Sequence, residues 1–468
     1  MSIVGRACAR AVLAVALVCA APFQIAAEEP PEAAKLRVLL LTDIGNEPDD
    51  AESFVRFLLY TNQFDVEGLI ATTSTWQRNR NQPQLLRERV DAYARVLPNL
   101  RRHAPGYPDA ETLLAAIHPG SSEYGMSGVG AGKDTEGSRA IVAAVDRADR
   151  RPIYIPIWGG AADLAQALWS VRAARSPEAV AAFVARLRVY SISDQDDAGP
   201  WIRREFPDLF WIASIHGWNQ YGMAAWIGIS GDLHRPVKWP AAEMVTNDWL
   251  ARYVRRGPLG ELYPPHLYIM EGDTPSFLGL IDNGLNVPGR PEFGGWGGRY
   301  VPAFEGSAHR ADAQDNYVDD NGAAWSGNQA TIFRWRRAFQ NEFAARIGWT
   351  LTPDFADANH APRAVLNGSG GTAPVTLTAR PGDTVRLSAA GSSDPDGDRL
   401  SYRWRYYPEP GSTMPGSAPQ VSLAGADSTE ASLAVPAGAI TLHVILEVAD
   451  SGEPPLVSYR RALIEIAP

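Results

Sequence analysis

From Leu36 onward, apolar runs with strand character alternate with patterns typical of amphipathic helices. Residues 36–41 form a predominantly apolar run, which predicts a buried strand. In the segment 51–59, apolar residues recur at intervals of three and four, which is the spacing of one helix face. Strand followed by helix, repeated, predicts an α/β fold with a mostly parallel sheet flanked by helices. The same patterns predict further strands at 66–72, 153–157, 187–192, 209–212 and 266–270, and further helices at 84–96, 161–170 and 329–346.

The pattern changes after residue 346. Proline, asparagine, glycine, serine and threonine dominate 352–381, and within it 367–372 has the composition of a linker or exposed loop. The short alternating runs beyond it predict an all-β, immunoglobulin-like sandwich. They lie at 384–387, 400–406 and 442–448.

The first 27 residues differ from the rest of the chain. Arg6 and Arg10 precede an apolar run at 11–21, and small residues follow before Glu28, which is the order of a cleaved export signal. Both cysteines lie in this segment, so we predict a mature protein without thiols or disulfides. We therefore expect a periplasmic or extracellular protein.

Three segments result. They are a signal peptide at 1–27, an α/β domain at 35–350, and a linker with a carbohydrate-associated β-sandwich at 351–468. No later run reaches the roughly 18 apolar residues of a membrane span, so we predict no membrane anchor once the signal is removed.

Charge narrows the class of partner. The chain has 53 acidic residues against 43 lysines and arginines, a net charge of −10, without a basic block. Nucleic-acid binding requires clustered lysine and arginine to neutralise phosphates, so no nucleic-acid partner is expected. A hydrophobic share of 45% also excludes a disordered chain.

The loop after the first predicted strand is strongly acidic. Asp43, Glu47, Asp49 and Asp50 lie between a strand end and a helix start. Carboxylates this close repel one another unless positive charge compensates, and calcium or magnesium takes carboxylate oxygens as ligands. The alternative is a helix amino terminus in which Asp49 and Asp50 complement exposed amides and the helix dipole. That alternative leaves Asp43, at the end of a buried strand, without a partner.

This loop resembles the calcium-binding signature of the nucleoside hydrolase superfamily, Asp-X-Gly-X-Asp-Asp, which Asp43, Gly45, Asp49 and Asp50 match in order. The segment 157–165 is similar to that family's Gly-Pro-Leu-Thr-Asn-Leu-Ala region. Glu271-Gly272-Asp273-Thr274-Pro275 resembles its late His-Asp-Pro segment. With the export signal and the C-terminal β domain, the chain looks most like the secreted nucleoside-hydrolase-like proteins named for a cellulose-binding member.

The resemblance implies a calcium site. Asp43, Asp50, Asp273 and the carbonyl of Trp158 would ligate calcium, and Asp49 would hold sugar hydroxyls. Asp43 would also accept a proton from the attacking water. Hydrolysis would pass through an oxocarbenium-like transition state and invert the anomeric centre.

Three departures from the family pattern bear on the substrate. Leu41 stands where the enzymes have an aspartate, three residues rather than one separate Gly45 from Asp49, and Gly272 occupies the place of a histidine that helps the departing base. We therefore predict a calcium-dependent hydrolase of N- or O-glycosyl bonds that acts on a carbohydrate rather than a nucleoside. The alternative is a non-catalytic cellulose- or carbohydrate-binding protein that retains the metal and sugar pocket.

Further site residues are candidates by position. Glu47 and Glu271 are candidate proton donors, which requires a raised pKa. Asp194, in the acidic segment 191–197, follows a predicted strand and is either a substrate ligand or part of a solvated turn. His216 and Asn219 could supply an acid and a sugar contact, although a lone histidine is more often a packing or surface residue.

A glycine-rich segment suggests a loop that covers the substrate. Four glycines surround Trp296 and precede Arg299 in the segment 294–299, which predicts an accessible indole and guanidinium on a mobile backbone. In the β domain, Asp394, Asp396 and Asp398 alternate in a turn that either binds calcium or forms Asx hydrogen bonds. The similarity of this turn to polycystic-kidney-disease-like modules implies an attachment role.

Overall fold

The computed structural model describes residues 34–216, 218–412, 417–438 and 440–467. Residues Lys35–Pro468 form one compact unit. The predicted signal peptide at 1–27 lies outside the described residues. Within the described ranges, no helix has the length and apolar character needed to cross a membrane.

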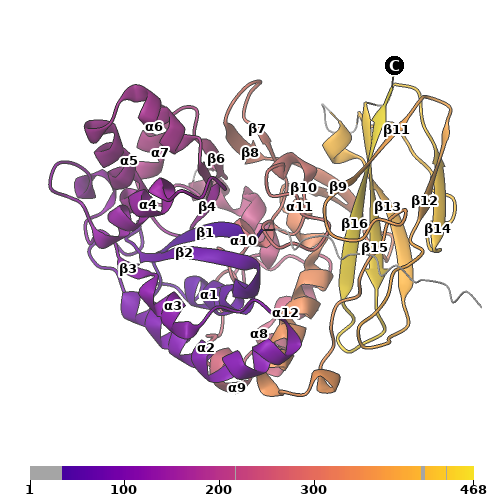
Figure 1. Cartoon of the computed structure of the whole chain (residues 1–468), viewed down its shortest axis with the longest axis horizontal. Helices are drawn as coiled ribbons and strands as arrows, with labels where there is room; N and C mark the ends of the chain where they lie inside the picture. Colours follow the sequence, from indigo (N-terminus) through magenta and orange to yellow (C-terminus); the bar gives the residue numbers. More distant parts are fainter. Residues whose placement is uncertain (1–33, 217, 413–416, 439, 468) are drawn as a thin grey trace, which may run out of the picture. The chain divides into compact units, whose positions relative to one another are not determined.

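An eight-stranded sheet organises the first part of the chain (Figure 1). Its order is β3-β2-β1-β4-β5-β6-β8-β7, and every neighbouring pair is parallel except β7 and β8. The carboxyl ends of the parallel strands therefore share one edge, where loops can place side chains from distant parts of the sequence together. The strands are β1 Leu36–Thr42, β2 Phe64–Ala71, β3 Ile117–Pro119, β4 Ile153–Ile157, β5 Leu187–Ser191, β6 Phe210–Ala213, β7 Tyr300–Pro302 and β8 His309–Asp312.

Helices cover both faces of this sheet, which explains the nearly continuous apolar sequence of β1. Val38 and Leu40 join the core beneath α1 and α2, whereas Leu39 and Leu41 join the core beneath α4, α5 and α7. Helix α12 packs on α1 and α2. The helices are α1 Asp49–Leu59, α2 Pro83–His103, α3 Ala110–Ala115, α4 Glu136–Asp146, α5 Ala162–Ala174, α6 Pro177–Val184, α7 Ala198–Glu205, α8 Asn247–Tyr253, α9 Gly257–Gly260, α10 Pro275–Leu278, α11 Ala330–Phe333 and α12 Arg336–Leu351.

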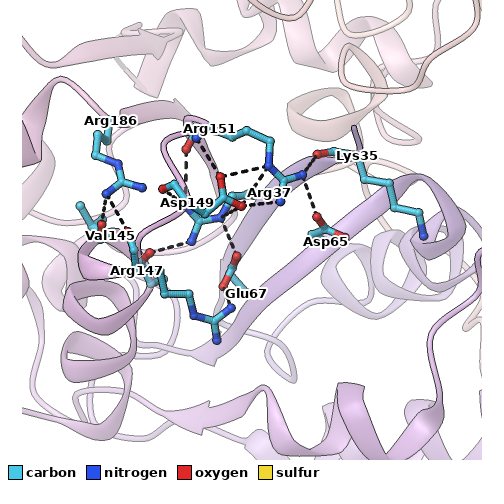
Figure 2. A network of polar contacts seen from close by, with 10 residues as sticks. Lys35, Arg37, Asp65, Glu67, Val145, Arg147, Asp149, Arg151 and Arg186 are labelled. Carbon is cyan, nitrogen blue, oxygen red and sulfur yellow. Dashed lines mark hydrogen bonds and ion pairs between the residues drawn. The ribbon is translucent and has the colours of Figure 1, made fainter. Parts of the chain in front are cut away.

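A network of arginines and acids ties the amino end of β1 to its surroundings (Figure 2). The fully buried Arg37 pairs with Glu67 at 2.6 Å and donates to the carbonyl of Ala144 at 2.6 Å. Asp149 lies 3.7 Å from Arg37 and also pairs with Arg151. This end of β1 is thus closed by structural ion pairs, so the opposite, carboxyl end is the one available for chemistry.

Two predicted elements differ from the structure. The prediction of a strand at 266–270 is wrong, because this segment forms only an isolated bridge between Ile269 and Asp232 and has no strand beside it. The helix predicted at 329–346 is two helices, α11 and α12, interrupted at residues 334–335.

The C-terminal part is built from strands. One sheet has the order β11-β16-β15-β13, and β12 pairs with β14. Leu387, Trp404, Leu446 and Ile464 form part of the buried core of these strands. The strands of this C-terminal part are β11 Val375–Ala379, β12 Thr384–Ser388, β13 Ser401–Tyr407, β14 Glu430–Ala434, β15 Thr441–Ala449 and β16 Val457–Ile466. A separate hairpin of β9 Asp315–Val318 and β10 Ala324–Gly327 precedes α11 and belongs to the α/β part.

Buried polar contacts join the β domain to the α/β part. Asp315 is fully buried and accepts hydrogen bonds from Arg299 at 2.7 Å, Arg334 at 2.9 Å and the Tyr407 hydroxyl at 2.7 Å. The two arginines hold the pKa of Asp315 below its usual value despite its burial. Because a buried charge is costly unless it is paired, this cluster fixes the β domain to its neighbour.

Candidate functional site

The loop between β1 and α1 places its acidic side chains at the carboxyl edge of the sheet. Asp43 and Asp50 are 4% and 5% exposed, whereas Glu47 and Asp49 are partly exposed. The Thr42 hydroxyl, at the end of β1, donates to Asp50. The strand end therefore orients a carboxylate in the first turn of α1.

A fourth aspartate reaches the same place from far along the chain. Asp273 precedes α10 and is 2% exposed. Its loop turns tightly, because Glu271 has a φ of 54° and the Thr274 amide donates to the Glu271 carbonyl at 3.1 Å. The Oδ2 atom of Asp273 is buried without a hydrogen-bond partner among the described residues. An unpaired buried oxygen is costly, so this atom is suited to an additional ligand.

The donor atoms fit a hard cation. Oxygen atoms from Asp49, Asp50 and Asp273 all lie within 4.8 Å of one another. Calcium takes six to eight oxygen ligands, with carboxylates and carbonyls among them. The residues present therefore match the chemistry of calcium.

The carbonyl of Trp158 lies at the end of β4, next to β1. The Trp158 amide donates to Leu41 at 2.9 Å, and its indole donates to Ser276 at 2.8 Å. The Trp158 carbonyl accepts a hydrogen bond from Gln195. A carbonyl oxygen has two lone pairs, so it retains capacity for a second interaction.

Asp43, the first acidic residue of the loop, is held in place on several sides. The Ser74 hydroxyl donates to Oδ2 of Asp43, and Gln77 donates to its carbonyl at 3.1 Å. A Cβ atom at Gly159 would lie 2.7 Å from Oδ1 of Asp43, closer than side chains tolerate. Sequence reasoning missed Ser74 and Gln77, although both follow the neighbouring strand β2 and share its edge of the sheet.

Burial and mutual repulsion raise the pKa values of these acids. Burial, with a smaller contribution from nearby Glu47, raises the pKa of Asp43 to about 6, although the hydrogen bond from Ser74 acts to lower it. Burial, Glu47 and Asp43 raise the pKa of Asp49 to about 8. The pKa values of Asp50 and Asp273 are raised well above their usual range by burial and by the neighbouring carboxylates. Without a compensating cation, the site resists holding all of its negative charges.

Aromatic side chains line the same pocket as the acids. The pocket has a volume of about 60 Å³, and of its aromatic residues Tyr221, Trp226 and Tyr268 were not predicted from the sequence. Trp76 is 45% exposed and Tyr268 is 51% exposed, so both rings reach the rim. Flat aromatic faces with polar edges suit sugar rings. The aromatic lining consists of Trp76, Trp158, Tyr221, Trp226 and Tyr268.

The two candidate proton donors occupy different environments. Glu47 lines the pocket, and burial raises its pKa, as a proton donor requires. Glu271 does not line the pocket and is fully buried. Its carboxylate pairs with Arg56 at 2.5 Å. The expectation that Glu271 reaches the substrate is therefore wrong, because its carboxylate is buried in the ion pair with Arg56.

Two predicted substrate ligands lie outside the acidic pocket. Asp194 pairs with Arg203 at 2.7 Å, and Asn219 is exposed in the short helix η3, Trp218–Met223. Neither residue lines the pocket. Gln195, the neighbour of Asp194, lines it instead.

The glycine-rich segment is not an open loop. Trp296 is fully buried against Phe339 and Tyr459, and Arg299 is 6% exposed because it pairs with Asp315. The prediction of an accessible indole and guanidinium is therefore wrong. A Cβ atom at Gly294 would collide with the hydroxyl of Tyr407. The glycine at 294 thus permits close packing against the β domain.

The alternating aspartates of the β domain also gather oxygen atoms. One oxygen from each of Asp394, Asp396 and Asp398 lies within 4.8 Å of the others. Asp394 accepts from the amides of the other two at 2.9 Å and 3.0 Å, which is the pattern of an Asx turn. Calcium binding by this turn stays a prediction.

Comparisons with known proteins complete the description. Residues 37–300 match the family described as "Cellulose-binding Sde182, nucleoside hydrolase-like domain", and residues 384–466 match "Cellulose-binding protein Sde0182, C-terminal domain". A solved structure of a nucleoside hydrolase-related hypothetical protein from Saccharophagus degradans, associated with carbohydrate metabolism, is 35% identical with a TM-score of 0.78. The match covers 93% of this chain and 100% of that chain.

More distant similarities add no functional argument. The type III effector XopQ, complexed with adenosine diphosphate ribose, is 12% identical with a TM-score of 0.35. The effector XOO4466 is 11% identical with a TM-score of 0.34. Each match covers 60% of this chain and 88% of the effector. No protein with a curated description matches the chain.

Proposed function

The chain belongs to the family of cellulose-binding Sde182 proteins with a nucleoside hydrolase-like domain, and from this premise we propose that it is a calcium-dependent hydrolase of glycosidic bonds in a carbohydrate. The observation that carries the proposal is the meeting of Asp49, Asp50 and Asp273 in a pocket that aromatic residues also line. The family description names cellulose, and the related protein from Saccharophagus degradans is associated with carbohydrate metabolism. Both support a carbohydrate substrate.

The proposed calcium ligands are Asp43, Asp50, Asp273 and the carbonyl of Trp158. Support comes from the unpartnered Oδ2 of Asp273 and from the raised pKa values of the neighbouring acids. When bound, calcium supplies positive charge that offsets the carboxylates, acidifies water and orients sugar hydroxyls.

The protein's own side chains divide the remaining chemistry. Asp43 accepts the proton of the attacking water, and the Ser74 hydroxyl holds one of its oxygens so that the other stays directed to the pocket. Asp49 accepts hydrogen bonds from sugar hydroxyls. Glu47 gives its proton to the leaving oxygen as the glycosidic bond breaks. Water attacks the anomeric carbon directly, so the product has inverted configuration.

A second candidate is a carbohydrate-binding protein without turnover. Two observations favour it. Gly272 replaces a histidine that the resembling enzymes use for the leaving group, and Arg56 keeps Glu271 out of the pocket. Of the two candidate proton donors, Glu47 and Glu271, only Glu47 can then donate a proton to the substrate.

Calcium titration and product release separate these functions. We expect the purified protein to bind calcium, and Asp43→Ala and Asp50→Ala to weaken binding at least tenfold by calorimetry. The control Asp208→Asn changes an exposed acid between α7 and β6 and should bind as the wild type does. Unchanged calcium binding in both alanine variants would overturn the proposed metal site.

Reducing-sugar release from a polysaccharide panel, with nucleosides included, tests turnover. We expect a product that disappears with a chelator, with Asp43→Ala and with Glu47→Gln. Glycan binding without product from any member of the panel would favour the non-catalytic function.

The proposed activity lies outside the cytoplasm. This part of the proposal is supported by the order of charges, apolar residues and small residues at 1–27. Cell fractionation of the full chain, compared with a chain lacking 1–27, should place only the full chain in the periplasm or medium. Equal distribution of the two chains would contradict export.

A further inference from the structure

A second and larger cavity lies between the sheet edge formed by β6, β8 and β7 and the loop that follows β13. Its volume is about 1250 Å³, and none of its lining residues lines the acidic pocket. Pockets for single drug-sized ligands usually measure about 300–1,000 Å³, so this groove has room for an extended ligand. We infer that it binds a strand of a neutral polysaccharide, independently of the acidic pocket.

Amide side chains supply the hydrogen-bonding surface of this polysaccharide groove. Gln314, Asn316 and Gln420 line it and are exposed. Their side-chain amides have no hydrogen-bond partner in the part of the chain that the structure describes. An uncharged amide offers both donors and an acceptor, which matches the paired donor and acceptor character of sugar hydroxyls.

Several charged groups along the groove are paired within the protein, whereas Glu305 and Arg310 form no ion pair among the described residues. Arg299 pairs with Asp315 at 2.7 Å, and His216 pairs with Asp312 at 3.0 Å. Arg203 pairs with Asp194 at 2.7 Å. A charged ligand would have to displace these pairs, whereas a neutral one would leave them intact.

Apolar side chains mark the rim. Phe304 lies in the hairpin between β7 and β8, between two residues that line the groove, and is 69% exposed. Ile215 lines the groove just after β6 and is 61% exposed. Figure 1 shows this hairpin extending from the edge of the sheet. An exposed ring at the rim of a groove lined by unpaired amides can stack on a sugar face while the amides bind the sugar hydroxyls.

The two walls are held at a fixed separation. Glu409 of the β domain accepts a hydrogen bond from the backbone N–H of Asn316 at 2.8 Å, and the Tyr407 hydroxyl donates to the buried Asp315 at 2.7 Å. Because both walls meet in this buried contact, the groove requires no closure to accept a strand, which lowers the cost of binding.

A depletion assay on insoluble polysaccharides tests the groove with the full chain. The probes are microcrystalline cellulose and neutral xylan, with the polyanion alginate for comparison. We expect Gln314→Ala/Asn316→Ala to bind neutral polysaccharide at least tenfold more weakly and Phe304→Ala about fivefold more weakly. Phe304→Tyr, which keeps the ring, should restore binding. The matched control Gln84→Ala removes an exposed amide from α2 and should bind as the wild type does.

Variants of the acidic pocket keep this test separate from the proposed hydrolase. Asp50→Ala and Asp273→Ala should lose calcium binding yet retain adsorption to polysaccharide within about twofold. The groove variants should retain calcium binding and thermal stability, which shows that they are folded. Wild-type adsorption by the double groove variant, loss of adsorption in the pocket variants alone, or stronger binding of alginate than of neutral glycans would each overturn the inference.

Discussion

The carboxylate of Glu271 and the guanidinium of Arg56 form an ion pair of 2.5 Å in which neither side chain is exposed. Arg56 belongs to α1, whose first turn carries Asp49 and Asp50. Glu271 lies two residues before Asp273. The pair therefore anchors the loop of one proposed calcium ligand, Asp273, to the helix that carries another, Asp50, so Glu271 is a positioning residue.

Replacing Glu271 by glutamine should destabilise the protein strongly. The change leaves the buried charge of Arg56 without a counter-ion, which costs about 3–5 kcal/mol. Urea unfolding should show a lower free energy of unfolding, and calorimetry should show weaker calcium binding because the Asp273 loop is no longer anchored. The control Glu243→Gln breaks an exposed pair with Arg337 and should change stability little. A wild-type urea midpoint for Glu271→Gln would contradict the anchoring role.

Replacing Gly159 by alanine should damage the metal site selectively. The added methyl group would lie 2.7 Å from Oδ1 of Asp43 and 2.8 Å from its Cβ, so the carboxylate must move. We expect at least a tenfold loss of calcium affinity by calorimetry, with the far-ultraviolet circular dichroism spectrum unchanged. Gly289→Ala is a suitable control, since nothing lies within 4 Å of its added methyl group. Equal affinities for the two variants would show that Asp43 does not depend on this contact.

Asp273→Asn should distinguish the destabilisation caused by repulsion among the carboxylates from their role in binding calcium. Asparagine removes one member of a repelling group, so the melting temperature in a chelator should rise by a few degrees. The same change removes the unpartnered carboxylate oxygen, so added calcium should no longer raise the melting temperature. Thermal unfolding with and without calcium measures both effects. An undiminished calcium response would exclude Asp273 as a ligand.

How far the sequence predicts the site depends on how close its residues lie along the chain. Asp43, Asp49 and Asp50 were recognisable because they share one loop, and the expected nucleoside-hydrolase-like α/β fold is confirmed by the family match and the related solved structure. Asp273 entered only through resemblance, because nothing local shows that its loop meets β1. The pocket's rim, including Tyr268, requires the folded arrangement of several loops.

The errors have physical causes that a linear sequence conceals. Glycine at 294 was interpreted as a source of mobility, yet it serves close approach to Tyr407 on a domain that lies far along the chain. Glu271 has the composition and position of an acid catalyst, but its partner Arg56 is 215 residues away. Sequence patterns identify chemical groups, whereas long-range packing decides which of them face the substrate.

Stability without calcium should fall as pH rises from 5 to 8. Burial raises the pKa of Asp43 to about 6 and that of Asp49 to about 8, above the ordinary 3.8. Between the ordinary and the raised pKa, the folded protein keeps protons that the unfolded chain has released, so each rise in pH favours unfolding. Calcium offsets the negative charge that these carboxylates gain as they ionise in the pocket, and its stabilising effect should therefore grow over the same range.

Thermal unfolding at pH 5, 6, 7 and 8, in chelator and in calcium, measures the gap between the two melting temperatures at each pH. We expect the calcium-dependent rise in melting temperature to be smallest at pH 5 and to widen by several degrees by pH 8. Other titrating groups contribute equally to both series, so the difference isolates the acidic pocket. In Asp43→Asn/Asp49→Asn this difference should be smaller and should depend less on pH, because only Asp50, Asp273 and Glu47 remain in the pocket to release protons. A gap that is constant with pH in the wild type would mean that the carboxylates are already ionised and compensated without the cation.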